Sequence, residues 1–164
     1  MKKVLLLSCL SLMVFASCKK KDNKTPEEIY AERINGDWNV SRLDYTAVVN
    51  VPILGPFPIN GTANEAGTVS FNTPAGTALY DIRFLPTLGN LPGAPAVDTI
   101  RLNGSGTFTN TTSSITLTES GGDVIVFTVE VNDENLQILK TNLNYQLDSV
   151  TTVPVGLELR MNRK

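Results

Sequence analysis

Apolar and polar residues alternate with a period of two along most of the chain after residue 38. The clearest runs are Tyr80-Ile82-Phe84, Ile125-Phe127-Val129-Val131 and Val155-Leu157-Leu159-Met161. Such alternation, rich in β-branched and aromatic residues, predicts strands with one buried face. We expect about eight to ten strands. They would pair antiparallel in up-and-down order, because the long crossover segments that parallel pairing requires are absent. Pattern alone leaves a barrel and a sandwich open.

One short helix is predicted before the strands. Thr25 is suited to be its N-cap, Pro26 to be its first residue, and Glu27-Glu28 to lie at the positive end of the helix dipole. The pair Asn35-Gly36 is typical of a helix end. We expect this helix to cover the β domain as a lid or plug.

Polar turn residues separate the predicted strands. Three segments favour hairpin turns: residues 103–106 (Asn-Gly-Ser-Gly), 120–123 (Ser-Gly-Gly-Asp) and 132–135 (Asn-Asp-Glu-Asn).

Two further stretches, residues 51–67 and 85–97, are both apolar and rich in proline. Proline cannot donate to a sheet ladder, so we exclude these stretches from central strands. They are interpreted either as long hairpin loops or as a hydrophobic rim around the mouth of a cavity. The second interpretation gives these candidate ligand-mouth residues: Ile53, Leu54, Phe57, Ile59, Leu88 and Leu91.

The first residues have the pattern of an export signal. Lys2 and Lys3 precede an apolar run, residues 4–16, and a lysine-rich segment begins at Lys19. A basic start, a short apolar stretch and small residues before polarity returns are typical of a secretory signal. The run is too short to cross a hydrocarbon core of about 30 Å comfortably. We expect a signal peptide at 1–17, a tether at 18–25 and a β domain at 26–164.

The composition restricts the chemistry of the folded part. The chain has no histidine, and its two cysteines, Cys9 and Cys18, both lie in the N-terminal segment. Histidine-based triads, disulfide frameworks and cysteine zinc sites are therefore excluded from the β domain. No nucleotide-binding or nucleophile-elbow motif occurs. Asp123 and Asp133 fall in predicted turns, and we expect the acidic residues on strands to face solvent. The sequence therefore predicts no enzyme, no metal site and no cofactor.

The charge distribution argues against nucleic acid as a partner. Residues 27–164 contain 8 basic and 15 acidic residues, a net charge of −7. Phosphate contacts need clustered Lys and Arg. The basic cluster is confined to residues 19–24.

Phe15-Ala16-Ser17-Cys18 resembles the lipobox of bacterial lipoproteins. The resemblance implies cleavage before Cys18, a diacylglycerol thioether on its sulfur and acylation of its new amino group. The protein would then have the membrane as a partner through a lipid anchor, with the lysines near anionic headgroups. Lys19 directly after the cysteine favours the outer membrane, and the periplasmic and surface faces both stay open. The alternative is an ordinary cleaved signal with an incidental cysteine.

Gly36-Asp37-Trp38 after a short helix resembles the Gly-x-Trp that opens the first strand of lipocalins. Phe71-Asn72, followed by Gly76-Thr77 and Tyr80, is similar to a hairpin of lipocalin-like lipoproteins from Bacteroidetes-type bacteria. The resemblance implies an up-and-down antiparallel barrel of about eight strands. Trp38 would close its bottom, with a late arginine stacked on the indole; Arg160 is the candidate by position.

The resemblance also implies a function, the binding of a small hydrophobic ligand inside the barrel. An eight-stranded barrel either holds one small ligand or is filled by its own side chains. The alternative is a structural, partner-binding or glycan-binding module with a filled barrel; no protein partner can be named. The two differ in whether the inward aromatic residues meet at the centre: Tyr45, Phe71, Tyr80, Phe84 and Phe127.

Two tripeptides resemble the O-glycosylation sites of exported Bacteroidetes-type proteins. They are Asp98-Thr99-Ile100 and Asp148-Ser149-Val150, with Thr99 and Ser149 as the candidate acceptors. A chance match is the other interpretation.

Overall fold

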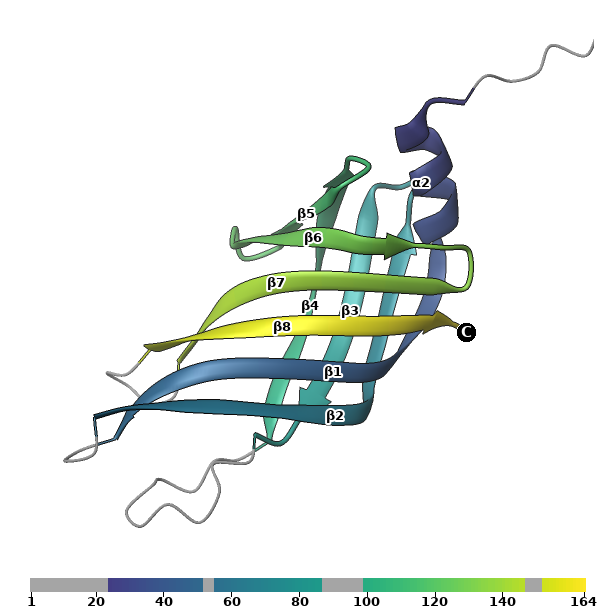
Figure 1. Cartoon of the computed structure of the whole chain (residues 1–164). Helices are drawn as coiled ribbons and strands as arrows, with labels where there is room; N and C mark the ends of the chain where they lie inside the picture. The colour runs from purple at the N-terminus through teal and green to yellow at the C-terminus, as the bar shows by residue number, and fades with distance from the viewer. Residues whose placement is uncertain (1–23, 52–54, 87–98, 147–151) are drawn as a thin grey trace, which may run out of the picture.

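A computed structural model describes residues 24–51, 55–86, 99–146 and 152–164 of the chain. The elements in this part are α2 (Pro26–Ile34), β1 (Gly36–Val51), β2 (Gly55–Asn72), β3 (Thr77–Phe84), β4 (Ile100–Asn110), β5 (Ser114–Glu119), β6 (Val124–Asn132), β7 (Leu136–Gln146) and β8 (Thr152–Arg163). Each strand pairs antiparallel with the next, and β8 pairs with β1, so the sheet closes into a barrel (Figure 1). The all-β class, the up-and-down order and the preceding helix are confirmed.

The helix α2 begins and ends where its capping residues predict. The Thr25 side chain accepts a hydrogen bond from the backbone N–H of Glu28, and the Glu28 carboxylate accepts one from the N–H of Thr25. This reciprocal pair is a capping box, and Pro26 occupies the first turn. The helix buries Tyr30 and Ile34 and lies at one end of the barrel, beside the C-terminus (Figure 1).

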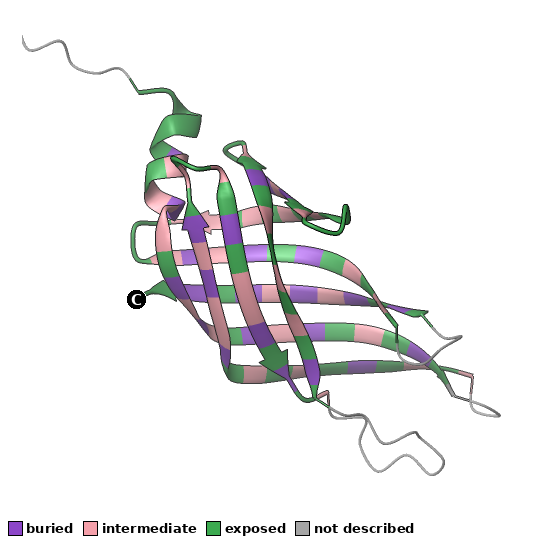
Figure 2. Ribbon diagram, turned by 180° about the vertical axis from the view of Figure 1, so that it is seen from behind, coloured by how far each residue is buried: buried purple, intermediate pink, exposed green. Residues whose placement is uncertain are grey.

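Burial follows the period-two pattern on the strands, as the alternating colours of Figure 2 show. The largest fully buried side chains gather toward α2, because they come from α2 itself, from the first half of β1, from the start of β5 and β7 and from the second half of β8. They include Trp38, Leu43, Leu139 and Met161. The barrel is therefore filled by side chains at its α2 end.

One predicted turn is wrong. Residues 103–106 lie inside β4, and the turn after β4 comes at residues 111–113. Gly104 is required there by a cross-strand neighbour: a Cβ at this position would lie 2.6 Å from the Tyr80 hydroxyl. Glycine in a strand often marks such a close approach and not a turn. The predicted turns at 120–123 and 132–135 do connect strands.

The loop interpretation of residues 51–67 is also wrong for the described part of that stretch. β2 includes Pro56 and Pro58, which lie opposite Asn50 and Val48 of β1. Pairing between β2 and β3 begins at Gly67, so among the described residues the first half of β2 pairs with β1 alone. Proline fits such an edge because no second ladder needs its missing N–H.

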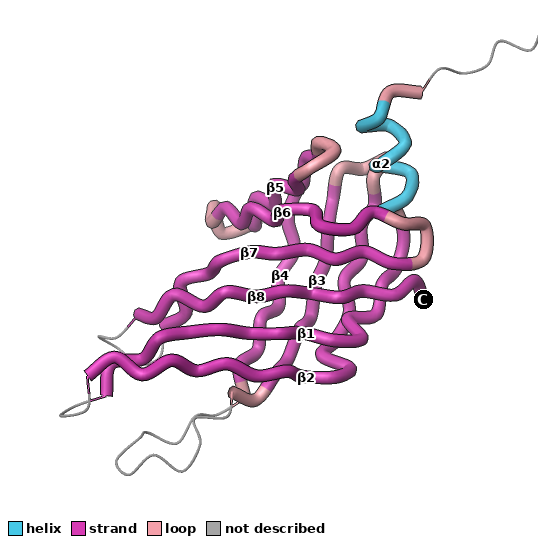
Figure 3. The backbone as a smooth tube through the Cα atoms, in the orientation of Figure 1, coloured by secondary structure: helices cyan, strands magenta, loops and turns pink. Residues whose placement is uncertain are grey.

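The barrel wall is incomplete along β5 and β6. β5 pairs with β4 at residues 106–110, and β6 pairs with β7 at residues 137–140. In the described structure, residues 100–105 of β4 and 141–146 of β7 therefore each have a strand neighbour on one side only (Figure 3). The Thr141 hydroxyl donates to the carbonyl of Val126 at 2.9 Å and holds the β5–β6 hairpin beside β7.

Among the described residues, no helix has the length and apolar character needed to cross a membrane.

The buried hydroxyl of Tyr30 leads to a stability prediction. The side chain is 0% exposed, and its oxygen has no hydrogen-bond partner among the described residues. Burial raises the pKa of Tyr30 well above its ordinary value near 10. Removing an unsatisfied buried hydroxyl relieves a desolvation cost, so Tyr30→Phe should raise the free energy of unfolding by about 1 kcal/mol at neutral pH. Urea unfolding followed by Trp38 fluorescence would measure it.

The same pKa shift predicts a pH dependence. Above about pH 10 the unfolded chain loses the Tyr30 proton while the folded protein keeps it, so the wild type loses stability as the pH rises. The advantage of Tyr30→Phe should therefore grow between about pH 9 and 11. An advantage that stays constant over this interval would contradict the assignment.

Candidate functional site

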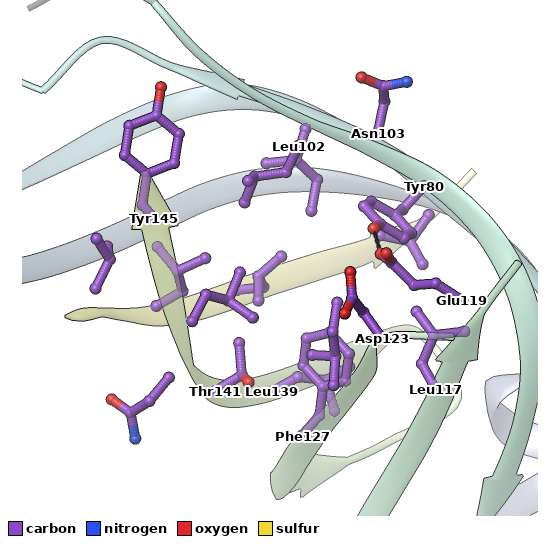
Figure 4. Close-up of a pocket in the computed structure, with 18 of the residues that line it drawn as sticks. Tyr80, Leu102, Asn103, Leu117, Glu119, Asp123, Phe127, Leu139, Thr141 and Tyr145 are labelled. Carbon is purple, nitrogen blue, oxygen red and sulfur yellow. Dashed lines mark hydrogen bonds between the residues drawn. The ribbon is translucent and has the colours of Figure 1, made fainter. Parts of the chain in front are cut away.

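A cavity of about 510 Å³ occupies the middle of the barrel and is lined by residues from β2 to β8 (Figure 4). This volume lies within the range of small-molecule pockets, about 300 to 1,000 Å³. Most of its lining is apolar, including Leu102, Leu117, Phe127, Leu139, Leu143 and Leu157. Leu139 and Leu159 separate it from the filled end, since both are buried and lie toward α2.

The inward aromatic side chains are spread around the cavity and do not fill it. Phe71, Tyr80, Phe84 and Phe127 all line it. The close ring pairs form at the periphery, where Tyr45 contacts Phe84 and Phe71 contacts Phe108, each with ring centroids 5.2 Å apart. The barrel thus has an open interior large enough for a small molecule.

The cavity reaches the surface through the incomplete part of the wall. Its lining includes exposed residues on either side of that gap, Asn103 on β4 and Asn144 on β7, together with Val124 next to the β5–β6 turn. Ile125 and Phe127 point inward from β6 yet remain half-exposed. A ligand can therefore enter between the β5–β6 hairpin and β7.

The polar end of the cavity is formed by Tyr80, Glu119 and Asp123. The Tyr80 hydroxyl donates a hydrogen bond to the Glu119 carboxylate. Figure 4 shows the carboxyl group of Asp123 beside that of Glu119, near the Tyr80 ring. Burial, together with the negative charge of Asp123, raises the pKa of Glu119 above its ordinary value. The environment at this end of the cavity therefore disfavours the negative charge of Glu119.

No described basic side chain forms an ion pair with Glu119 or Asp123. Arg101 borders the cavity, but its guanidinium group lies against Asp81 at 3.2 Å. Arg83 beside Asp81, with Arg101, holds the pKa of that carboxyl below its usual range. This pairing occupies the guanidinium on the outer face of the sheet. The three internal segments outside the described part, residues 52–54, 87–98 and 147–151, contain no lysine or arginine in their sequence.

The structure places two of the six candidate ligand-mouth residues. Ile59 is 6% exposed and lines a small second cavity of about 40 Å³, and Phe57 is half-buried against the core. Neither lines the larger cavity. Ile53, Leu54, Leu88 and Leu91 lie outside the described residues.

The Gly-x-Trp segment lies where the helix enters the barrel. Gly36 has a φ of +120°, a conformation that favours glycine, and it precedes the fully buried Trp38. The indole N–H of Trp38 donates to the carbonyl of Ile34 at 2.7 Å. This bond fixes the end of α2 on the barrel.

The arginine stacked on Trp38 is Arg163, and the prediction of Arg160 is wrong. The Arg163 guanidinium lies 4.6 Å from the centroid of the indole ring. Arg160 is exposed, because it has the opposite parity from the inward residues Leu159 and Met161. Residue 163 follows Leu159 and Met161 in the series of inward positions on β8. Arg160 and Arg163 lie on the same strand, and the alternation of side chains along that strand determines which of them reaches Trp38.

The Arg163 side chain also binds three backbone carbonyls in two segments at this end. Its nitrogens donate to the carbonyls of Arg33, Asn35 and Glu134. The C-terminal end of α2 and the β6–β7 turn are therefore both attached to the last residue of β8.

Sequence reasoning missed Glu119, which was expected to face solvent with the other acidic residues on strands. It follows Ile115 and Leu117 at every second position of β5, and this parity directs it inward. A charged residue in an apolar alternating series was the available signal. Asp123 does lie at the predicted turn, at the cavity border.

The remaining candidate sites are modification sites. Thr99 is exposed just before β4, and Cys18 and Ser149 lie outside the described residues.

No protein-family model matches the chain, and no curated protein is significantly similar to it in sequence.

Replacing Arg163 should destabilise the protein, and replacing Arg160 should not. Arg163→Ala removes the stack on Trp38 and three hydrogen bonds, so we expect the free energy of unfolding to fall by about 2 kcal/mol. Arg160→Ala is the matched control on the same strand and should change it by less than about 0.5 kcal/mol. Equal effects in urea unfolding would contradict the assignment of Arg163.

Proposed function

We propose that this protein is a lipid-anchored envelope protein whose lipocalin-like barrel binds a small hydrophobic ligand. The observation that carries the proposal is the apolar cavity of about 510 Å³, open at the gap beside the β5–β6 hairpin. Burying an apolar molecule there gains roughly 25 cal/mol per Å² of surface removed from water. The buried side chains at the α2 end close the cavity on that side.

A binding assay with a neutral fluorescent probe tests the proposal. N-phenyl-1-naphthylamine brightens in apolar surroundings, and we expect it to bind the purified full chain with one site per protein. Ile125→Trp places a larger side chain in the cavity and should weaken binding at least about tenfold. The measurement is a titration of probe emission.

Val126→Trp is the matched control for this variant. Val126 neighbours Ile125 on β6 but is 53% exposed and lies outside the cavity lining, so its replacement should leave probe affinity unchanged. Absence of probe binding by the wild type, or equal loss in both variants, would reject the cavity as the site. The module with no interior ligand would then be favoured.

The envelope location in the proposal is supported by the N-terminal sequence. Residues 4–16 are apolar and lead to Ala16-Ser17-Cys18, which resembles a lipobox, and Lys19 follows. The described chain begins at Lys24 next to α2, so an upstream anchor would join the barrel at its filled end (Figure 1). A ligand would then meet the cavity on the part of the barrel away from the tether.

Replacing the proposed lipid attachment residue tests the anchor. Several acyl chains at about 0.8 kcal/mol per buried CH₂ hold a protein firmly on a membrane. Cys18→Ala should therefore move the protein from the membrane fraction to the soluble fraction, and Cys9→Ala should leave it on the membrane. Membrane retention of Cys18→Ala after a high-salt wash would reject lipid anchoring at this residue.

A further inference from the structure

The cavity combines an apolar body with a negatively charged end. Leu102, Phe127 and Leu143 belong to the apolar part, and Glu119 lies with Asp123 at the β5–β6 end (Figure 4). An amphiphile with one polar head matches this division better than a wholly apolar molecule. The negative charge of the cavity then determines whether a cationic, neutral or anionic head group binds best.

Glu119 is held in position by its neighbours. Tyr80 donates its hydroxyl to the carboxylate, and Gly104 leaves the space that the Tyr80 side chain occupies. A carboxylate has acceptor sites on both oxygens, so one tyrosine hydroxyl leaves capacity for further donors. The group faces the cavity as a fixed acceptor.

The negative charge at this end of the cavity is unpaired within the part of the chain that the structure describes. Glu119 and Asp123 have no basic partner among the described residues, and the nearby Arg101 is paired with Asp81. A partly buried carboxylate gains most from a ligand that brings a positive charge and N–H donors. A ligand carboxylate or phosphate would meet two like charges. The net charge of −7 over residues 27–164 attracts cations over a longer range.

A metal ion is a weaker match to the same residues. The described residues contain no group of three or more acidic side chains or cysteines that could surround a metal. Hard cations such as calcium take six to eight oxygen ligands. An organic ammonium needs only two or three acceptors and also fills the apolar part.

The geometry points to a cationic amphiphile as the ligand: an alkyl or aryl ammonium compound whose head contacts Glu119 and Asp123 and whose apolar body occupies the cavity. This inference rests on the proposed function, since it names the class of ligand for the same cavity. Tyr80 orients the Glu119 carboxylate, and the Leu and Phe side chains contact the hydrocarbon.

Three ligands of equal chain length separate the effect of the head from that of the hydrocarbon. Decylamine, decanol and decanoate are each titrated at pH 7 against the full chain loaded with N-phenyl-1-naphthylamine, and displacement of the probe gives their affinities. We expect decylamine to bind at least about tenfold more tightly than decanol, and decanoate to bind least tightly.

Charge-neutral variants assign the preference to the two carboxylates. Glu119→Gln keeps an oxygen that can accept from Tyr80, and with Asp123→Asn it should reduce the preference for decylamine over decanol to less than about threefold. Probe affinity should stay at the wild-type value. Glu130→Gln removes an equal charge from the outer face of β6 and is the control, since it should leave the preference unchanged.

The pH dependence provides an independent readout. Decylamine stays protonated throughout acidic and neutral pH, so its affinity should fall as the pH is lowered through the raised pKa of Glu119, when the carboxylate becomes neutral. Among the described residues, the titratable groups that interact with this carboxylate are Tyr80 and Asp123. Decanol affinity should not follow this change, and Glu119→Gln should weaken the decylamine response.

The outcomes distinguish the inference from the function on which it rests. If the probe itself does not bind, the proposed function fails. If the probe binds but decanoate equals or exceeds decylamine, or the double variant keeps the preference, the cavity remains a binding site and the cationic class is rejected.

Discussion

Closure of the sheet by the β1–β8 pair is the constraint on which the rest of the structure depends. The pairing runs from Trp38 opposite Arg163 to Ala47 opposite Val155. Once the sheet is closed, each strand has one face toward the interior and one toward solvent. On β8, every second side chain therefore points into the barrel, and the side chains between them point to solvent. This alternation directs Arg163 onto Trp38 and leaves Arg160 outside.

The interior that this closure creates is divided along its length. At the α2 end, Trp38, Leu139 and Met161 are packed without exposure, and the helix is attached there through Trp38 and Arg163. Farther along the barrel, shorter β5 and β6 strands leave part of the wall open, and the cavity lies behind it. The proposed binding of a small molecule rests on this combination of a filled end and a partly open wall.

The same parity gives the cavity its chemistry. Ile115, Leu117 and Glu119 all point inward from β5, so a strand that builds the core at one end brings a carboxylate into the cavity at the other. The Tyr80 hydroxyl holds that carboxylate, and this contact requires Gly104 on the neighbouring strand to lack a side chain. The contacts on β3, β4 and β5 together place a hydrogen-bonded carboxylate at the apolar cavity.

Local sequence determined the helix with its capping box, the presence of half-buried strands and their up-and-down order. Capping and period-two burial can be predicted because they depend on residues close in the chain. Local sequence misassigned residues 103–106 and the edge part of β2. Gly104 makes room for the Tyr80 side chain, and Pro56 lies on a part of β2 that pairs with β1 alone among the described residues. Only the tertiary structure decided the number of strands, the stacking arginine, the cavity and the inward carboxylate. These depend on which strands become neighbours and in what register, and that information is spread over residues far apart in the chain.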